Sequence, residues 1–130
     1  MPVVKGPFQV KLTPQAADER EAAGFLGRLN IDKQFRGDLE ATSLGQMLAA
    51  RGDQPVSAGY VAIEQVTGTL AGRAGSFILQ HSGHSSPVGQ SLEINIVADS
   101  GTDALKGLTG SMKIVIEPDG AHFYELTYEV

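Results

Sequence analysis

The sequence contains no cysteine, which excludes disulfide bonds, a thiol nucleophile and thiolate metal ligands. Tryptophan is also absent and aromatic residues make up only 6% of the chain, so a core must be built mainly from Val, Ile, Leu and Ala. The 10 basic residues are scattered singly in a chain of net charge -5, which leaves no basic stripe for a nucleic-acid backbone. No apolar run approaches the length of a membrane span. We therefore expect no nucleic-acid partner and no membrane partner.

The composition that remains is typical of one globular domain. At 130 residues, of which 42% are hydrophobic, the chain is long enough to bury a core and too short for two domains, so residues 1–130 are treated as one. The first ten residues, MPVVKGPFQV, lack the charged and then apolar layout of a signal peptide, which favours a cytoplasmic protein. The glycine-rich stretch at 100–110 lacks the Gly-Lys-Ser/Thr ending of a phosphate-binding loop. We expect no cofactor.

The clearest pattern is a long hairpin over residues 57–83, SAGYVAIEQVTGTLAGRAGSFILQHSG. A turn at Ala71-Gly72 would pair Val66 with Phe77, Glu64 with Leu79 and Ala62 with His81. One face of this hairpin would then be mostly apolar, yet it would carry a carboxylate, Glu64, and an imidazole, His81, on diagonal neighbours within reach of each other. A one-residue error at the turn would move both groups to the outside.

Period-two alternation predicts further strands over 6–13, 25–35, 39–45 and 92–98, with a turn at 36–38. A last hairpin turns at Pro118-Asp119-Gly120, which would place Ile116 opposite His122, Ile114 opposite Tyr124 and Met112 opposite Leu126. Thr13 and Pro14 are typical of a helix N-cap and first turn, so the stretch up to Gly24 is either a short helix or a loop.

These segments sum to about eight antiparallel strands, nearly all with one apolar face. Sheets of that size avoid exposed edges by closing, and glycines inside the strand patterns, such as Gly45, Gly59, Gly68 and Gly75, fit the bends of a barrel. The predicted fold class is therefore all-β, a closed antiparallel barrel of about eight strands. A two-sheet sandwich is the alternative. An eight-stranded barrel has an interior that is either filled by side chains or wide enough for one small ligand.

Three segments carry a resemblance to known families: NIDKQFRGDLEATS, the hairpin sequence above, and SGTDALKGLTGSM. From Asn30 onward the chain resembles a bacterial family of uncharacterised proteins of this size, which implies no particular activity. More distantly, SGTDALKGLTG is similar to the glycine-rich segment before a late strand in the allene oxide cyclase and dirigent-type barrels. That likeness implies an allene oxide cyclase-like barrel with a cavity for an apolar ligand, often in homo-oligomers. No catalytic residue of those families matches a position here.

Three polar side chains fall on the predicted inward faces: Lys33, Glu64 and His81. Because an unpaired buried charge is costly, these groups must pair, bind water or line a cavity open to solvent. They could form a catalytic site in which Glu64 or His81 is the general base and Lys33 steadies an anionic group, or a structural ion pair that fixes strand register. The residues expected to contact a ligand in the cavity are Lys33, Phe35, Ser43, Tyr60, Glu64, Phe77, Leu79, His81 and Tyr124.

Other kinds of site are disfavoured. His81 and His84 are three apart and would face opposite sides of a strand, so we expect no metal site, and no Gly-x-Ser-x-Gly motif indicates a serine nucleophile. Three functions stay open: a binding protein for a small, mainly apolar ligand, a cofactor-independent isomerase or cyclase acting by proton transfer, and a structural or partner-binding barrel with a filled interior. Apolar residues on the predicted outer faces, such as Val61, Ile63 and Val115, predict a homo-oligomer.

Overall fold

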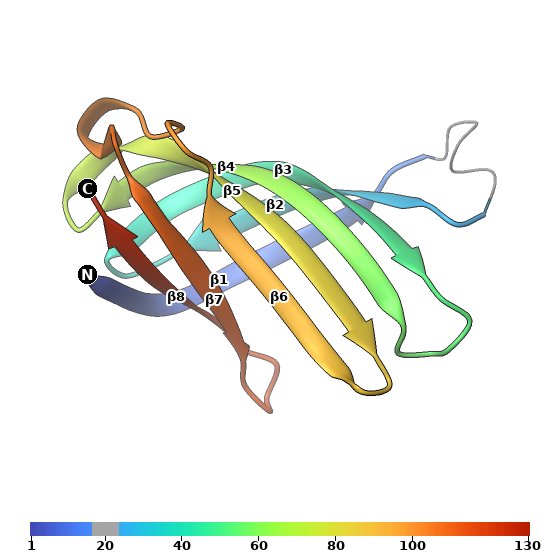
Figure 1. Ribbon diagram of the computed structural model, residues 1–130. Coiled ribbons are helices and arrows are strands. Elements are labelled where there is room, and N and C mark those ends of the chain that lie inside the picture. The colour runs from blue at the N-terminus through green and yellow to red at the C-terminus, as the bar shows by residue number, and fades with distance from the viewer. Residues whose placement is uncertain (17–23) are drawn as a thin grey trace.

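The computed structural model describes residues 1–16 and 24–130, which form an up-and-down arrangement of strands (Figure 1). Every strand is antiparallel to its neighbours. No helix among the described residues is long and apolar enough to cross a membrane. In chain order the elements are β1 (Val3–Pro14), β2 (Gly27–Phe35), β3 (Leu39–Arg51), β4 (Ala58–Leu70), β5 (Arg73–Ser86), β6 (Gly89–Ile96), the 3-10 helix η2 (Asp103–Leu105), β7 (Thr109–Ile116) and β8 (His122–Glu129).

The sheet closes on itself because β1 pairs with β8 as well as with β2. Buried and exposed residues alternate along most strands, which is the pattern that closure around an apolar interior requires. The prediction of a closed, all-β barrel of eight antiparallel strands is therefore confirmed, and the sandwich alternative is excluded.

The register predicted for the long hairpin is confirmed. Ala71 and Gly72 form the turn, and Leu70 pairs with Arg73, Glu64 with Leu79 and Ala62 with His81. Both turn residues have positive φ, 48° and 85°, which is the conformation that a tight two-residue hairpin needs. The last hairpin also has the predicted register, with Ile116 opposite His122.

One prediction near the N-terminus is wrong. Thr13 and Pro14 do not begin a helix: β1 continues through both residues, which pair with Asn30 and Leu29 of β2. A proline is tolerated there because β1 pairs with β8 only as far as Phe8, so Pro14 lies on a part of the strand that has one free edge. The rest of the expected helix or loop falls largely on residues 17–23, which lie outside the described residues.

The two ends of the barrel differ. At the end that carries both chain termini, the connection between β6 and β7 folds across the opening, and its Leu105 and Leu108 are almost completely buried. They join Leu39, Leu70 and Phe77 in the apolar core. The opposite end carries the β3–β4, β5–β6 and β7–β8 turns and has no such plug among the described residues. We call these the closed end and the open end.

The seam between β6 and β7 is the shortest in the barrel. Only two residue pairs join these strands, Ile94 with Met112 and Asn95 with Ser111. Toward the open end the ladder stops, although β6 continues back to Gly89 and β7 forward to Ile116. The wall of the barrel is therefore least closed beside its open end.

Candidate functional site

A polar cluster lies inside the barrel, centred on the carboxylate of Glu64. Lys33 Nζ donates to Glu64 Oε2 at 2.7 Å, and His81 Nε2 lies 2.6 Å from the same oxygen. Ser43 Oγ donates to Oε1 at 2.7 Å. The four side chains come from β2, β3, β4 and β5, so the cluster spans four adjacent strands. All four are buried, and Glu64 is 0% exposed.

The strand registers bring these side chains together. Lys33 of β2 pairs with Ser43 of β3. On β4, Ala62 is two residues before Glu64 and points to the same face, and Ala62 pairs with His81 of β5, so His81 is a diagonal neighbour of Glu64. Gly45 stands directly opposite Glu64, and a Cβ on this glycine would overlap the backbone of Ile63 and Glu64. The absence of a side chain at Gly45 therefore lets β3 and the backbone of β4 lie close together at Glu64.

The cluster keeps Glu64 ionised. Burial alone would raise the pKa of its carboxyl group, but the hydrogen bond from His81, the charge of Lys33 and the hydrogen bonds from Lys33 and Ser43 lower this pKa from 4.5 to about 2. The Lys33 ammonium group also lies 5.3 Å and 5.7 Å from the ring centres of Phe8 and Phe35, a favourable cation–π arrangement. A carboxylate this acidic, with all its near partners in place, is a poor general base at neutral pH.

Tyr60 connects the cluster to the open end. Its hydroxyl lies 3.4 Å from His81 Nδ1, while Nε2 of the same ring faces Glu64. In the neutral imidazole a proton on Nε2, held by the carboxylate, leaves Nδ1 as the acceptor for the Tyr60 hydroxyl. Burial, and secondarily the charge of Glu64, raises the pKa of Tyr60. Gly83 pairs with Tyr60 across the β4–β5 ladder, and a Cβ there would overlap the Tyr60 ring.

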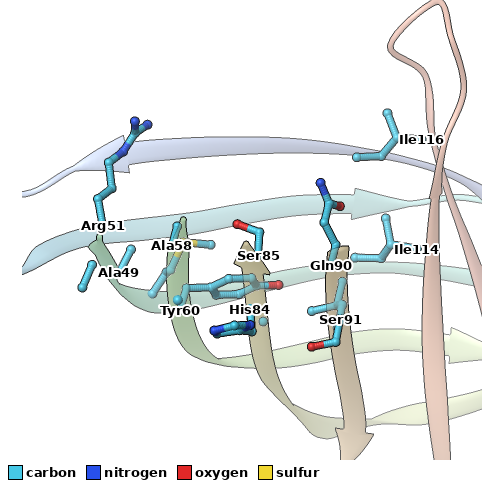
Figure 2. A pocket seen from close by; sticks show the side chains of 15 residues that line it. Ala49, Arg51, Ala58, Tyr60, His84, Ser85, Gln90, Ser91, Ile114 and Ile116 are labelled. Atoms are coloured by element: carbon cyan, nitrogen blue, oxygen red, sulfur yellow. The ribbon is translucent and has the colours of Figure 1, made fainter. Parts of the chain in front are cut away.

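A hollow of about 550 Å³ occupies the open end of the barrel. Figure 2 shows the Tyr60 ring between Arg51 on one side and Ile114 and Ile116 on the other. The hollow is lined by Met47, Ala49, Ala50, Arg51, Ala58, Gly59, Tyr60, Gly83, His84, Ser85, Gln90, Ser91, Leu92, Ile114 and Ile116. Leu92 and Ile116 are exposed although both stand on inward positions, because β6 and β7 separate beside them. The lining is thus mainly apolar, with Tyr60 toward the buried cluster.

Arg51 supplies the one full charge among the residues that line this hollow. It is the last residue of β3 and pairs with Ala58, and its side chain is exposed. The described residues offer it no ion pair, and the lining includes no aspartate or glutamate. An arginine at the mouth of an apolar hollow has the donors that a carboxylate or another anionic group would need.

The nine residues predicted to contact a ligand all point inward, but they do not lie together at the hollow. Tyr60 lines it; Lys33, Ser43, Glu64 and His81 form the cluster beneath it. Phe35, Phe77, Leu79 and Tyr124 belong to the apolar core. Contact of these residues with a ligand remains a prediction.

Tyr124 has partners of its own in the protein. Its hydroxyl donates to the Arg36 carbonyl at 2.7 Å and accepts from the Leu39 amide at 3.1 Å, so it holds the β2–β3 turn in place. Burial of the ring, and secondarily the charges of Asp38 and Glu40, raises the pKa of this phenol despite the opposing hydrogen bond from Leu39. These contacts favour a structural role for Tyr124 at the closed end of the barrel, away from the hollow.

Sequence reasoning missed Arg51, Met47, Ala49 and Gln90 as lining residues. The sequence does contain a signal for three of them: Met47, Ala49 and Arg51 continue the alternation of 39–45, which predicts that their side chains point inward. His84 faces outward on its strand, as expected from its spacing to His81, and the described residues include no group of three or more His, Asp or Glu placed to hold a metal.

Comparison with known proteins identifies the family but no activity. No curated protein matches the chain. The crystal structure of a protein with unknown function from the DUF3224 family of Shewanella oneidensis MR-1 is 49% identical, covers 99% of this chain and 96% of its own, and superposes with a TM-score of 0.92. The likeness to allene oxide cyclases is not confirmed by these comparisons. The model of the family described as protein of unknown function (DUF3224) matches residues 4–128, and the chain therefore belongs to the DUF3224 family.

Proposed function

We propose that the protein binds a small, mainly apolar molecule with one anionic end in the hollow at the open end of the barrel. The observation that carries this proposal is the hollow of about 550 Å³, whose wall leaves Leu92 and Ile116 exposed. A cavity of this size and lining is typical of small-molecule sites. A barrel with a purely structural role would gain stability by filling this space with larger side chains than Ala49 and Ala58.

The anionic end is assigned to Arg51, and this changes the roles expected from sequence. Lys33 already neutralises Glu64 in the buried cluster, and its side chain is only 5% exposed. Arg51, by contrast, lies at the mouth, and it is an exposed residue. An apolar body against Leu92, Ile114 and Ile116 with a carboxylate or sulfonate at Arg51 satisfies both parts of the lining.

A pair of fluorescent probes tests the proposal. The anionic probe is 1-anilinonaphthalene-8-sulfonate, and N-phenyl-1-naphthylamine is the same ring system without the charge. We expect both to bind the folded protein. Ala49→Trp, which places a large side chain on the hollow opposite Tyr60, should abolish both signals. Ala74→Trp is the matched control, because Ala74 is exposed on an outward position of β5 at the other end.

Arg51→Gln separates the charge from the apolar contacts. Since an exposed ion pair is worth up to about 1 kcal/mol, we expect this variant to bind the sulfonate about fivefold more weakly and the neutral probe unchanged. If the Ala49→Trp variant binds both probes as well as the Ala74→Trp control does, the site is refuted. An equal effect of Arg51→Gln on both probes would refute the anchor alone.

A proton-transfer reaction is the second candidate, and the chain of Tyr60, His81 and Glu64 favours it. Glu64 lies against Nε2 of His81, and with the proton on Nε2 the Nδ1 atom is the acceptor for Tyr60, the residue that lines the hollow. Tyr60 and His81 would then move a proton to or from a bound ligand, as in an isomerase or cyclase without cofactor. The test is exchange of the α-protons of 2-tetralone in D₂O, followed by NMR. Exchange that His81→Asn slows severalfold supports catalysis, and exchange equal to that in buffer leaves binding as the function.

A further inference from the structure

One part of the outer wall of the barrel has almost no charge. Of the outward positions on β3, β4 and β5, only Glu40, at the start of β3, carries a carboxylate or a basic group of Lys or Arg. The five other described strands each carry at least one outward charge, for example Lys11 on β1, Asp32 on β2 and Glu93 on β6. In a chain with 19% charged residues, three adjacent strands with this pattern form a distinct surface.

Large apolar side chains are exposed on the same surface. Leu44 is 69% exposed, Val61 52% and Ile63 50%. Glutamines alternate with them, so that across the three strands the rows read Leu44, Gln65, Ile78, then Gln46, Ile63, Gln80, then Leu48, Val61, Ser82. We call these nine residues the uncharged face. Exposed apolar groups collected on one wall, without the charges that cover the other walls, are typical of an interface.

We propose that the uncharged face binds a second copy of this chain in a two-fold symmetric dimer. Two copies that each carry a net charge of -5 repel each other, and they approach at least cost through a wall that carries no charge. A positively charged partner would instead be drawn to the walls that carry the carboxylates. The composition of the face therefore favours a second copy over a basic protein.

The rows of the uncharged face are also complementary to themselves. In a face-to-face dimer with its two-fold axis parallel to β4, each residue of β3 lies over the residue of β5 in the same row of the other copy. Leu44 then meets the partner's Ile78, and Gln46 meets the partner's Gln80. On the axis, Ile63 meets the partner's Ile63. In the first two rows apolar groups thus contact apolar groups, and the amide side chains of the glutamines are able to hydrogen-bond to each other. In the third row Leu48 meets the partner's Ser82.

The size of the face predicts a weak dimer. Three strands about 4.8 Å apart, each with three same-face residues about 6.8 Å apart, give a flat footprint of roughly 300 Å². That is well under half of the ~800 Å² per partner in a stable complex, so flanking residues must add the rest. We expect dissociation in the micromolar range.

Sedimentation equilibrium from about 1 to about 200 µM tests the proposal. The mass of the wild-type protein should rise from 13.7 kDa toward twice that value. Ile63→Glu should keep the protein monomeric because two carboxylates meet on the axis, and Ile63→Lys should do the same. Val115→Glu on β7, where the valine is also exposed, is the matched control and should still dimerise.

A mixture of the Ile63→Glu and Ile63→Lys variants gives the sharpest result. Opposite charges then meet on the axis, so the mixture should recover the dimer that neither variant forms alone. If thermal unfolding shows that the Ile63 variants are not folded, Gln65→Glu and Gln65→Lys repeat the test at a neighbouring position on β4. A wild-type protein that stays at 13.7 kDa up to about 200 µM overturns the proposal, and so does a dimer that Val115→Glu disrupts and Ile63→Glu does not.

Discussion

Removal of the buried charge at Glu64 is expected to destabilise the protein strongly, and the loss should depend on pH. In the folded state the pKa of Glu64 is about 2, against an ordinary value of 4.5. A difference of roughly 2.5 units corresponds to about 3 kcal/mol of folding stability at pH 7. The carboxyl is more acidic in the folded state, so this contribution is complete above about pH 5 and is lost as the pH falls through 4.5 toward 2.

Glu64→Gln keeps the shape of the side chain and removes its charge, which leaves the Lys33 ammonium group buried against a neutral amide. We expect its free energy of unfolding in urea to fall by about 3 kcal/mol at pH 7, in the range found when one partner of a buried pair is removed. Near pH 2 the wild-type carboxyl takes up a proton as well, and the difference between the two proteins should become small.

Two further variants show that the charge is responsible. Lys33→Met together with Glu64→Gln removes the unpaired cation, so the double variant should be more stable than Glu64→Gln alone. Glu93→Gln, an exposed outward position on β6, should change stability by less than about 0.5 kcal/mol. A loss below about 1 kcal/mol for Glu64→Gln at pH 7, or the same loss at pH 7 and at pH 3, would refute the reasoning.

Three other substitutions probe the elements that shape the barrel. Leu105→Ala empties a buried position of the plug and should cost about 3 kcal/mol in urea unfolding, whereas Leu48→Ala on the exposed wall should cost under about 1 kcal/mol. Tyr124→Phe leaves the Arg36 carbonyl and the Leu39 amide without their partner, so we expect a loss of about 1–2 kcal/mol and faster hydrogen exchange at the Leu39 amide; unchanged exchange would contradict this. Gly83→Ala should destabilise the protein because its Cβ overlaps the Tyr60 ring, and a cost that persists in a Tyr60→Ala background would show that the contact is not the cause.

Local rules were sufficient for the strands and for the inward direction of the cluster. The hairpin at 57–83 has a short turn flanked by alternating residues, and a two-residue turn fixes the pairing of everything that follows. Glu64 and His81 were therefore placed on one face, as diagonal neighbours, from the sequence alone. The same logic failed at Thr13 and Pro14, where helix-start residues stand at the end of a strand and tertiary pairing with β2 prevails over local preference.

The division of the interior into a filled part and a hollow could not be predicted in this way. Whether Phe77 or Tyr60 meets a ligand depends on which end of the barrel is plugged, and the plug comes from Leu105 and Leu108 in a segment without strand periodicity. The hollow in turn depends on the separation of β6 from β7, which ends the ladder after two residue pairs. Both features arise from contacts between distant segments and leave little trace in the local pattern. The homo-oligomer, the ligand and the cytoplasmic location remain predictions.

The pairing of β1 with β8 also affects how the chain is made. Every other ladder joins strands that follow each other in sequence, so those hairpins are able to form while the ribosome is still translating. Phe8, however, cannot pair with His122 until the ribosome has made β8. During that interval β1 and the newest strand both present open hydrogen-bonding edges, at which two nascent chains are able to pair with each other. Expression yield should therefore respond to translation speed over the codons of 109–129.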